Sequence, residues 1–237
     1  VFDADKELVR ASLRTYFIDL LLDEKIREKP DREAAAAILA KAAASKFDAV
    51  FAPDESAQNL LDRLGFAARA LPEEAWPDVS SDALAKRLAA LCDGLYSFAE
   101  VRRIDWRGVL RSELGLLSRA LDEEVPSHIA VPSGSRIRVA YAEAANGKGA
   151  PSLAARIQEL FGMRTAPRIA RGRVALSIHL LAPNGRPAQV TTDLESFWRN
   201  TYPEVRKELR ARYPRHDWPE DPTTAVATSR AKKRKKT

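Results

Sequence analysis

The spacing of apolar residues changes at Pro126, and this change limits the chain to a fold with two kinds of secondary structure. Between residues 31 and 121, leucines and alanines recur at helical spacing. Beyond Pro126, apolar side chains alternate with polar ones, as Ile137, Val139 and Tyr141 do, which is typical of strands. The sequence therefore predicts an α+β fold. We expect a β-hairpin and helical bundle over residues 1–124, and a small mixed α/β domain with antiparallel strands and a long kinked helix over 125–222. A disordered basic tail is expected over 223–237.

The first half predicts one hairpin and four helices. Residues 5–28 alternate like a hairpin, although their run of leucines also suits a helix. Four helices are then predicted. They run from about 32 to 46 after the cap Asp31, from Pro53-Asp54 to about 70, from Ser80 or Ser81 to a stop at Gly94, and from the cap Asp105 to about 121.

The second half predicts short strands and two helices. Strands are expected at 129–131 and 136–141, and a short helix at 151–161. A strand over 174–180 turns at Asn184-Gly185 into a partner that ends at Val190, because Asn-Gly tolerates the positive φ of tight hairpin turns. A helix starting at Thr192 or Asp193 should kink or restart at Pro203, which lacks an amide proton.

Charge is distributed unevenly along the chain. Residues 1–129 carry 18 basic and 24 acidic side chains, whereas residues 130–229 carry 15 and 9, and residues 230–237 add six basic ones. A basic second half predicts an anionic partner, with nucleic acid preferred to acidic lipid. The alternative is that the tail only aids solubility.

The sequence offers no catalytic or metal-binding motif. Its single cysteine, Cys92, reads as a small buried residue on a helix and fits a reducing cytoplasm. The Gly147-Lys148 pair lacks the glycine spacing of a phosphate loop, and no Asp-Glu-Ala-His box occurs. The three histidines have no metal-ligand spacing, and no apolar stretch approaches the ~20 residues of a membrane span. We therefore expect no catalysis, cofactor or metal in this chain, and no membrane partner.

Arginines are the residues most suited to a binding role. Their planar donor forks match phosphate oxygens, and several lie in clusters too dense to be needed for core packing. The alternative is pairing within the chain, for which Glu204 with Lys207 and Glu208 with Arg212 have helical spacing. Trp198 and the nearby tyrosines Tyr202 and Tyr213 could stack on bases but more often serve as core at such spacing. The predicted nucleic-acid-binding residues are Arg136, Arg138, Arg168, Arg171, Arg173, Arg199, Arg206, Arg210, Lys232, Lys233, Arg234, Lys235 and Lys236.

A series of motifs over residues 125–230 resembles a known family. The series is Ser152-Leu-Ala-Ala-Arg-Ile-Gln-Glu-Leu-Phe-Gly162, Leu180-Leu-Ala-Pro-Asn-Gly-Arg-Pro187, Gln189-Val-Thr191, Asp193-Leu-Glu-Ser-Phe-Trp198, Tyr202-Pro-Glu-Val-Arg-Lys-Glu-Leu209, Arg212-Tyr-Pro-Arg-His216 and Trp218-Pro-Glu-Asp-Pro222. Together these motifs resemble the C-terminal region of HrpB-type, DEAH-box bacterial ATP-dependent helicases. Asn184-Gly185 and Ala211 depart from the expected form, but both are turn or surface changes.

The resemblance implies a parent protein with two RecA-like motor domains upstream that use ATP and Mg. That parent would act on RNA in preference to DNA, and the opening hairpin would end an upstream β-barrel-like domain. The family's ATP-binding residues match no position here. We therefore expect a non-catalytic accessory region that binds nucleic acid without sequence specificity. The alternative is an interaction module that docks on the parent's motor domains or on an outside partner.

Overall fold

The structure, a computed structural model, describes residues 1–27 and 30–229 and forms two compact units. The first unit holds Val1–Leu61 and Pro77–Leu114, and the second holds Asp62–Trp76 and Gly115–Thr237. Each unit is discontinuous in sequence, because the boundary falls inside helix α3 (Glu55–Ala70). The domain boundaries predicted at residues 124 and 222 remain a prediction. Within the described ranges, no helix is both long and apolar enough to cross a membrane.

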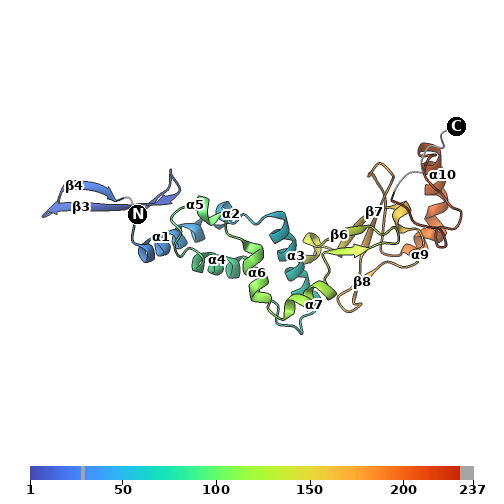
Figure 1. The fold of residues 1–237 in the computed structure, drawn as a ribbon, viewed down its shortest axis with the longest axis horizontal. Coiled ribbons are helices and arrows are strands. Elements are labelled where there is room, and N and C mark those ends of the chain that lie inside the picture. Colours follow the sequence, from blue (N-terminus) through green and yellow to red (C-terminus); the bar gives the residue numbers. More distant parts are fainter. Residues whose placement is uncertain (28–29, 230–237) are drawn as a thin grey trace. The chain divides into compact units, whose positions relative to one another are not determined.

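The first unit contains two small antiparallel hairpins and a set of helices (Figure 1). The paired strands are β1 (Phe2–Asp3) with β2 (Leu8–Val9), and β3 (Ala11–Phe17) with β4 (Leu20–Arg27). The helices are α1 (Arg32–Ser45), α2 (Phe47–Val50), the start of α3, α4 (Ser81–Ala90), α5 (Phe98–Val101) and α6 (Trp106–Leu114). Asp31 caps α1 as predicted, because its carboxylate accepts a hydrogen bond of 2.9 Å from the Ala34 amide.

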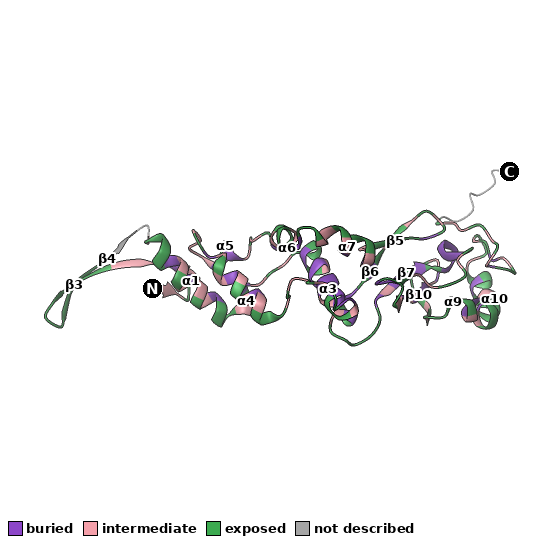
Figure 2. Ribbon diagram, turned by 90° about the horizontal axis from the view of Figure 1, so that it is seen from below, coloured by how far each residue is buried: buried purple, intermediate pink, exposed green. Residues whose placement is uncertain are grey.

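Buried side chains of the first unit come mainly from its helices, whereas the β3–β4 hairpin is largely exposed (Figure 2). Leu39 of α1, Leu88 of α4 and Leu110 of α6 are fully buried. The predicted hairpin is confirmed over Ala11–Arg27, whose antiparallel register excludes the competing helix, whereas Leu8–Val9 pairs with Phe2–Asp3 instead.

Gly115 divides the helix predicted from Asp105 to residue 121. The structure has two helices there, α6 and α7 (Leu117–Glu124). Gly115 adopts a φ of +49°, a left-handed conformation that ends a helix and that favours glycine. The prediction of one continuous helix was wrong because it gave this glycine no weight.

The second unit is built on a five-stranded sheet in the order β11-β10-β7-β6-β5 (Figure 1). Its strands are β5 (His128–Ala130), β6 (Arg136–Ala140), β7 (Ser152–Arg156), β10 (Ser177–Leu181) and β11 (Pro187–Thr191). Neighbouring strands are antiparallel except β7 and β10, which are parallel. The α+β class and the hairpin turn at Gly185, with a φ of +82°, are confirmed.

The helix predicted over residues 151–161 is wrong. Residues Ser152–Arg156 form the central strand β7, and only Ile157–Leu160 makes a short 3-10 turn, η1. Leucine, alanine and arginine favour helices in isolation. Here the backbone of β7 pairs with strands on both sides, and this long-range pairing outweighs local propensity.

The remaining elements of the second unit are small except for the C-terminal helix. They are α8 (Ala142–Ala145), β8 (Arg168–Ile169), β9 (Val174–Ala175), α9 (Leu194–Ser196), a π-helical turn η2 (Phe197–Thr201) and α10 (Tyr202–Arg212). The π turn ends just before Pro203, so the kinked helix is confirmed. Residues 223–229, predicted to be disordered, differ from expectation, because the Thr228 amide donates to the Gln158 carbonyl at 2.9 Å.

Arg63 ties α3 to the end of α7 inside the second unit. Its side chain is only 3% exposed, and its Nε donates to the Val125 carbonyl at 2.7 Å. Its Nη2 donates to the Leu121 carbonyl at 3.1 Å and to the Asp122 carboxylate at 2.6 Å. The Leu121 carbonyl also accepts from the Val125 amide at 2.9 Å, whereas the Val125 carbonyl lies past the last turn of α7, so the guanidinium supplies a donor that the helix cannot.

We predict that Arg63→Gln lowers the free energy of unfolding by about 3 kcal/mol, because it removes the donor to the Val125 carbonyl and the ion pair with Asp122. Urea unfolding of the whole chain measures the change. Arg119→Gln is the matched control, since Arg119 pairs with Glu123 on the surface with its own side chain 87% exposed. Equal stability of the two variants would contradict a central role for Arg63.

Candidate nucleic-acid interface

One face of the five-stranded sheet is uncovered. Val139 pairs with Leu153 and Leu153 with Ile178, and these three side chains are fully buried on the opposite face. Successive residues of a strand point to opposite faces, so Ala154 lies on the other side. Ala154 is exposed although it belongs to the central strand. The middle of this face, which we call the open face, is therefore accessible.

Arginines from two strands lie on the open face. Arg136 and Arg138 alternate with Val139 on β6, and Arg156 alternates with Ala155 on β7. All three arginines are exposed, and within residues 1–27 and 30–229 neither Arg136 nor Arg156 has an ion pair. Sequence reasoning missed Arg156 because residues 151–161 were read as a helix.

Two histidines also lie on the open face. His128 on β5 is opposite Arg138, and His179 on β10 is opposite both Ala154 and Val190. None of the residues of these five strands that share the open face is acidic. An anion that approaches this face therefore meets arginine forks and no strand carboxylate.

The arginines around the β8–β9 turn are engaged within the second unit. Arg171 forms ion pairs with Glu73, at 2.7 Å, and with Glu74. Arg173 pairs with Glu73 at 2.7 Å and donates to the Ala70 carbonyl at 3.0 Å. These two predicted binding residues thus hold the turn against the segment that follows α3.

Arg168 also serves the same turn. Its Nε donates to the Gly172 carbonyl at 2.7 Å, and its Nη2 donates to the Arg173 carbonyl at 3.2 Å. Ala170 and Arg171 have φ values of +53° and +57°, which are unfavourable for residues other than glycine. The hydrogen bonds from Arg168 help hold the turn in this conformation.

The arginines of the kinked helix differ from one another. Arg199 pairs with Glu195 at 2.7 Å on the surface, and Arg206 donates to the Trp218 carbonyl at 2.8 Å. Arg210 is exposed and, among the described residues, has no ion pair. Only Arg210 of this group keeps its guanidinium available. The predicted residues Lys232, Lys233, Arg234, Lys235 and Lys236 lie outside the described residues.

The aromatic residues considered as stacking platforms form a core instead. Trp198 is 5% exposed and Tyr202 is fully buried, and their rings meet edge to face at 5.4 Å. The Trp198 indole donates to the Met163 carbonyl at 2.7 Å. In the described part of the chain, no group of His, Cys, Asp or Glu side chains is arranged to hold a metal ion.

We predict that Glu73→Gln lowers the denaturation midpoint at pH 7. The hydrogen bond from Arg173 is the main cause that lowers the pKa of Glu73 from 4.5 to about 2. A carboxylate with a depressed pKa stabilises the fold above its unfolded pKa, and loses this effect as the pH falls through the folded value. In urea unfolding, the difference in denaturation midpoint between the parent chain and Glu73→Gln should therefore shrink as the pH falls from about 4.5 to 2. Glu143→Gln, a change at an exposed residue, serves as the control. A difference in midpoint that stays as large at pH 2 as at pH 7 would contradict the ion pair between Glu73 and Arg173.

Comparison with known proteins identifies relatives of this chain. A family model described as "ATP-dependent helicase C-terminal" matches residues 87–222. The ATP-dependent RNA helicase HrpB of Escherichia coli (strain K12) is 43% identical over 185 residues, which cover 75% of this chain and 22% of that protein. The chain thus spans under a quarter of the length of this relative.

Solved structures agree with the sequence comparison. A crystal structure of the E. coli DExH-box NTPase HrpB matches with a TM-score of 0.77 and 33% identity, covering 96% of this chain and 30% of that one. A crystal structure of the Escherichia coli DEAH/RHA helicase HrpB matches with a TM-score of 0.67 and 35% identity, covering 92% and 28%. The resemblance seen in the motifs is confirmed, and the chain belongs to the HrpB-type ATP-dependent helicases as a C-terminal region of that family.

Proposed function

We propose that this C-terminal region is an accessory nucleic-acid-binding module of an ATP-dependent helicase. The observation that carries the proposal is the open face, where Arg136, Arg138 and Arg156 stand exposed on a sheet without acidic strand neighbours. In the whole protein, motor domains outside this chain would bind ATP and Mg. The region would then hold the strand while the motor moves it.

Binding through this face should be insensitive to base sequence. Arginine forks recognise phosphate oxygens, and backbone contacts carry no sequence information. The basic residues 230–237 would add further phosphate contacts. RNA is the proposed substrate in preference to DNA, since the curated relative is named an RNA helicase.

The first experiment is the binding of a labelled single-stranded RNA across a salt series. If the six basic residues of 230–237 all contact phosphates, truncation after Ser229 should remove about 4 from the logarithmic salt slope, at ~0.7 for each contact. In the truncated chain, the double variant Arg136→Gln, Arg156→Gln should remove about 1.4 more.

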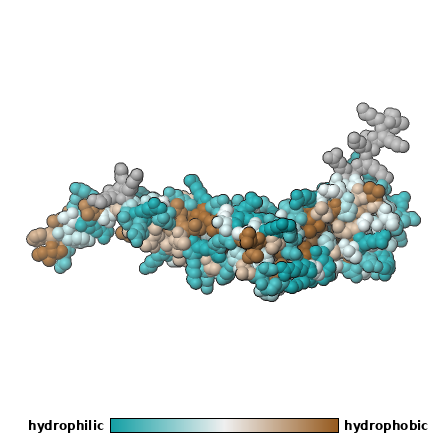
Figure 3. Space-filling model, turned by 60° about the horizontal axis from the view of Figure 1, so that its bottom comes forward, coloured by the Kyte–Doolittle hydropathy of each residue, from teal (hydrophilic) through white to brown (hydrophobic). Residues whose placement is uncertain are grey.

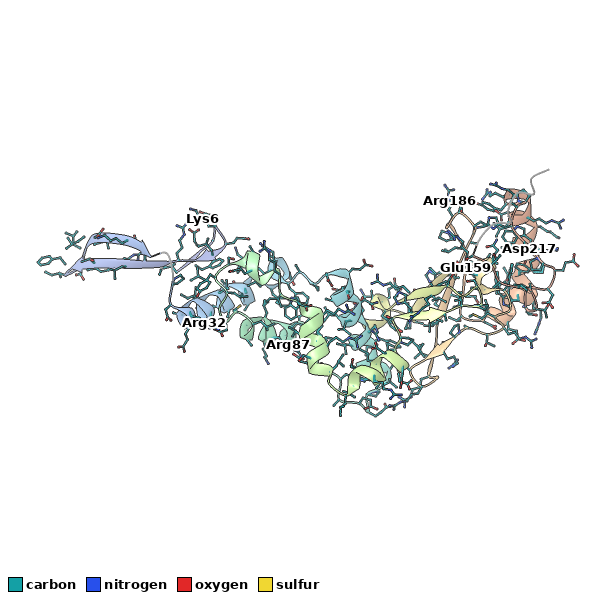
Figure 4. All side chains as sticks on the ribbon, viewed as in Figure 1. Lys6, Arg32, Arg87, Glu159, Arg186 and Asp217 are labelled. Carbon is teal, nitrogen blue, oxygen red and sulfur yellow. The ribbon has the colours of Figure 1, made fainter. Side chains whose placement is uncertain are left out.

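The matched control is Arg186→Gln, because Arg186 is exposed at the β10–β11 turn and belongs to none of the strands (Figure 4). Absence of binding by the whole chain near physiological salt would overturn the proposal. An unchanged salt slope in the double variant would mean that the open face does not contact the RNA.

A second candidate function, protein docking, is favoured by the β3–β4 hairpin. Phe17, Ile18 and Leu20 are 64%, 83% and 65% exposed, and apolar atoms gather at this end of the first unit (Figure 3). Exposed apolar patches mark contact surfaces. We propose that the hairpin packs against the motor-bearing part of the parent protein.

We predict that Ile18→Asp with Leu20→Asp lowers the melting temperature of the whole helicase, because the hairpin then buries charge. The same change should leave the RNA affinity of the isolated chain unaltered. Calorimetry of both proteins measures the effect, and Lys6→Gln is an exposed control in the same unit (Figure 4). A whole helicase that melts at its original temperature would contradict hairpin docking.

A further inference from the structure

The open face is divided into a basic part and a part without arginine, lysine or acid. The basic part belongs to β6 and β7, which carry Arg136, Arg138 and Arg156. The other part belongs to β10 and the edge strand β11, and neither of these fully described strands contains an arginine, lysine, aspartate or glutamate. The character of the open face therefore changes between β7 and β10.

The strand register identifies the residues of the second part. His179 and Leu181 alternate along β10 with the fully buried Leu180, so they lie on the open face. Val190 of β11 pairs with His179 and therefore lies on the same face. We call His179, Leu181 and Val190 the neutral side. Val190 is 52% exposed, so the neutral side presents apolar surface to solvent.

The basic part and the neutral side adjoin each other residue by residue. In the parallel register of β7 and β10, Arg156 is opposite Leu181 and Ala154 is opposite His179. Neighbouring strands of a sheet are about 4.8 Å apart. Ala154 is exposed and contributes only a methyl group to this junction. A ligand can therefore contact the arginines and the neutral side at the same time.

A single-stranded nucleic acid has the same division into two parts. Its phosphates carry the negative charge, and its unpaired bases are uncharged rings with accessible faces. Arginine forks bind phosphate oxygens, whereas bases stack on aromatic rings, including imidazoles. In a duplex the bases stack on one another, so their faces are not available to side chains.

We propose that RNA binds the open face with its phosphates over β6 and β7 and its bases over the neutral side. The inference rests on the proposed function and adds to it an orientation of the bound RNA and the use of unpaired bases. The imidazole of His179 supplies a ring for stacking, and Val190 supplies an apolar contact at the edge of the sheet. Stacking on these residues tolerates any base, because every base has a π face.

The test compares two ligands that have the same backbone. A short single-stranded oligouridylate carries bases, whereas an abasic strand of the same length keeps the phosphodiesters without them. The affinity of the whole chain for each ligand is measured by fluorescence anisotropy of the labelled strand. Arg136→Gln combined with Arg156→Gln should weaken the binding of both ligands to the same extent, because both ligands keep their phosphates.

Substitutions on the neutral side should affect oligouridylate alone. Val190→Trp should tighten its binding about ten-fold, which is about 1.4 kcal/mol and within the range of base–aromatic stacking. His179→Ala should weaken its binding about five-fold. Neither change should alter the affinity for the abasic strand. Leu116→Trp is the matched control, because Leu116 is 99% exposed and belongs to none of the strands.

The outcomes separate this orientation from the proposed function. If the arginine variant weakens binding while Val190→Trp and His179→Ala change nothing, the orientation is wrong and nucleic-acid binding stands. An equal gain on the abasic strand, or an equal gain in Leu116→Trp, would also overturn it, because contact between bases and the neutral side would not be the cause. If the whole chain binds neither ligand, the proposed function fails and the orientation fails with it. Val190 is exposed on an edge strand, so its variant keeps the test valid if His179→Ala misfolds.

Discussion

A single buried guanidinium joins the helical and sheet-forming segments of the second unit. Arg63 donates to the Val125 and Leu121 carbonyls at the end of α7, and the chain runs from there into β5 through Pro126. Tyr141, at the end of β6, donates its hydroxyl to the Pro126 carbonyl at 2.8 Å. Its ring lies 5.3 Å from that of Phe66 on α3. The first strands of the sheet are therefore anchored to α3 by buried polar contacts as well as by packing.

Strand β7 determines which face of the sheet remains open. It is parallel to β10 and antiparallel to β6, so its apolar side aligns with Val139 and Ile178 and leaves Ala154 and Arg156 on the other side. A central strand with a small exposed residue and an exposed arginine gives an accessible basic surface. Such a surface can contact a phosphate backbone along several strands at once.

The basic side chains fall into distinct groups once their partners are known. Arg171 and Arg173 are engaged with Glu73, and Arg206 with the Trp218 carbonyl, so these three stabilise the fold. Arg136 and Arg156 stand on the open face without an ion pair in the described residues. Charge counted along the chain overstates the number of arginines that are available to a ligand, because pairing with distant acids is invisible in the count.

The sequence by itself determined the α+β class, the capped helices α1, α3 and α4, the β10–β11 turn and the restart of the helix near Pro203. These features depend on local capping residues, on glycine conformations and on the missing amide proton of proline, all of which can be read from the sequence. Its motifs also determined the family. Only the tertiary structure made residues Ser152–Arg156 a strand, since hydrogen bonds to two distant strands overcame their helical propensity. It likewise decided which arginines face solvent, because pairing with acids such as Glu73 depends on packing between segments remote in sequence.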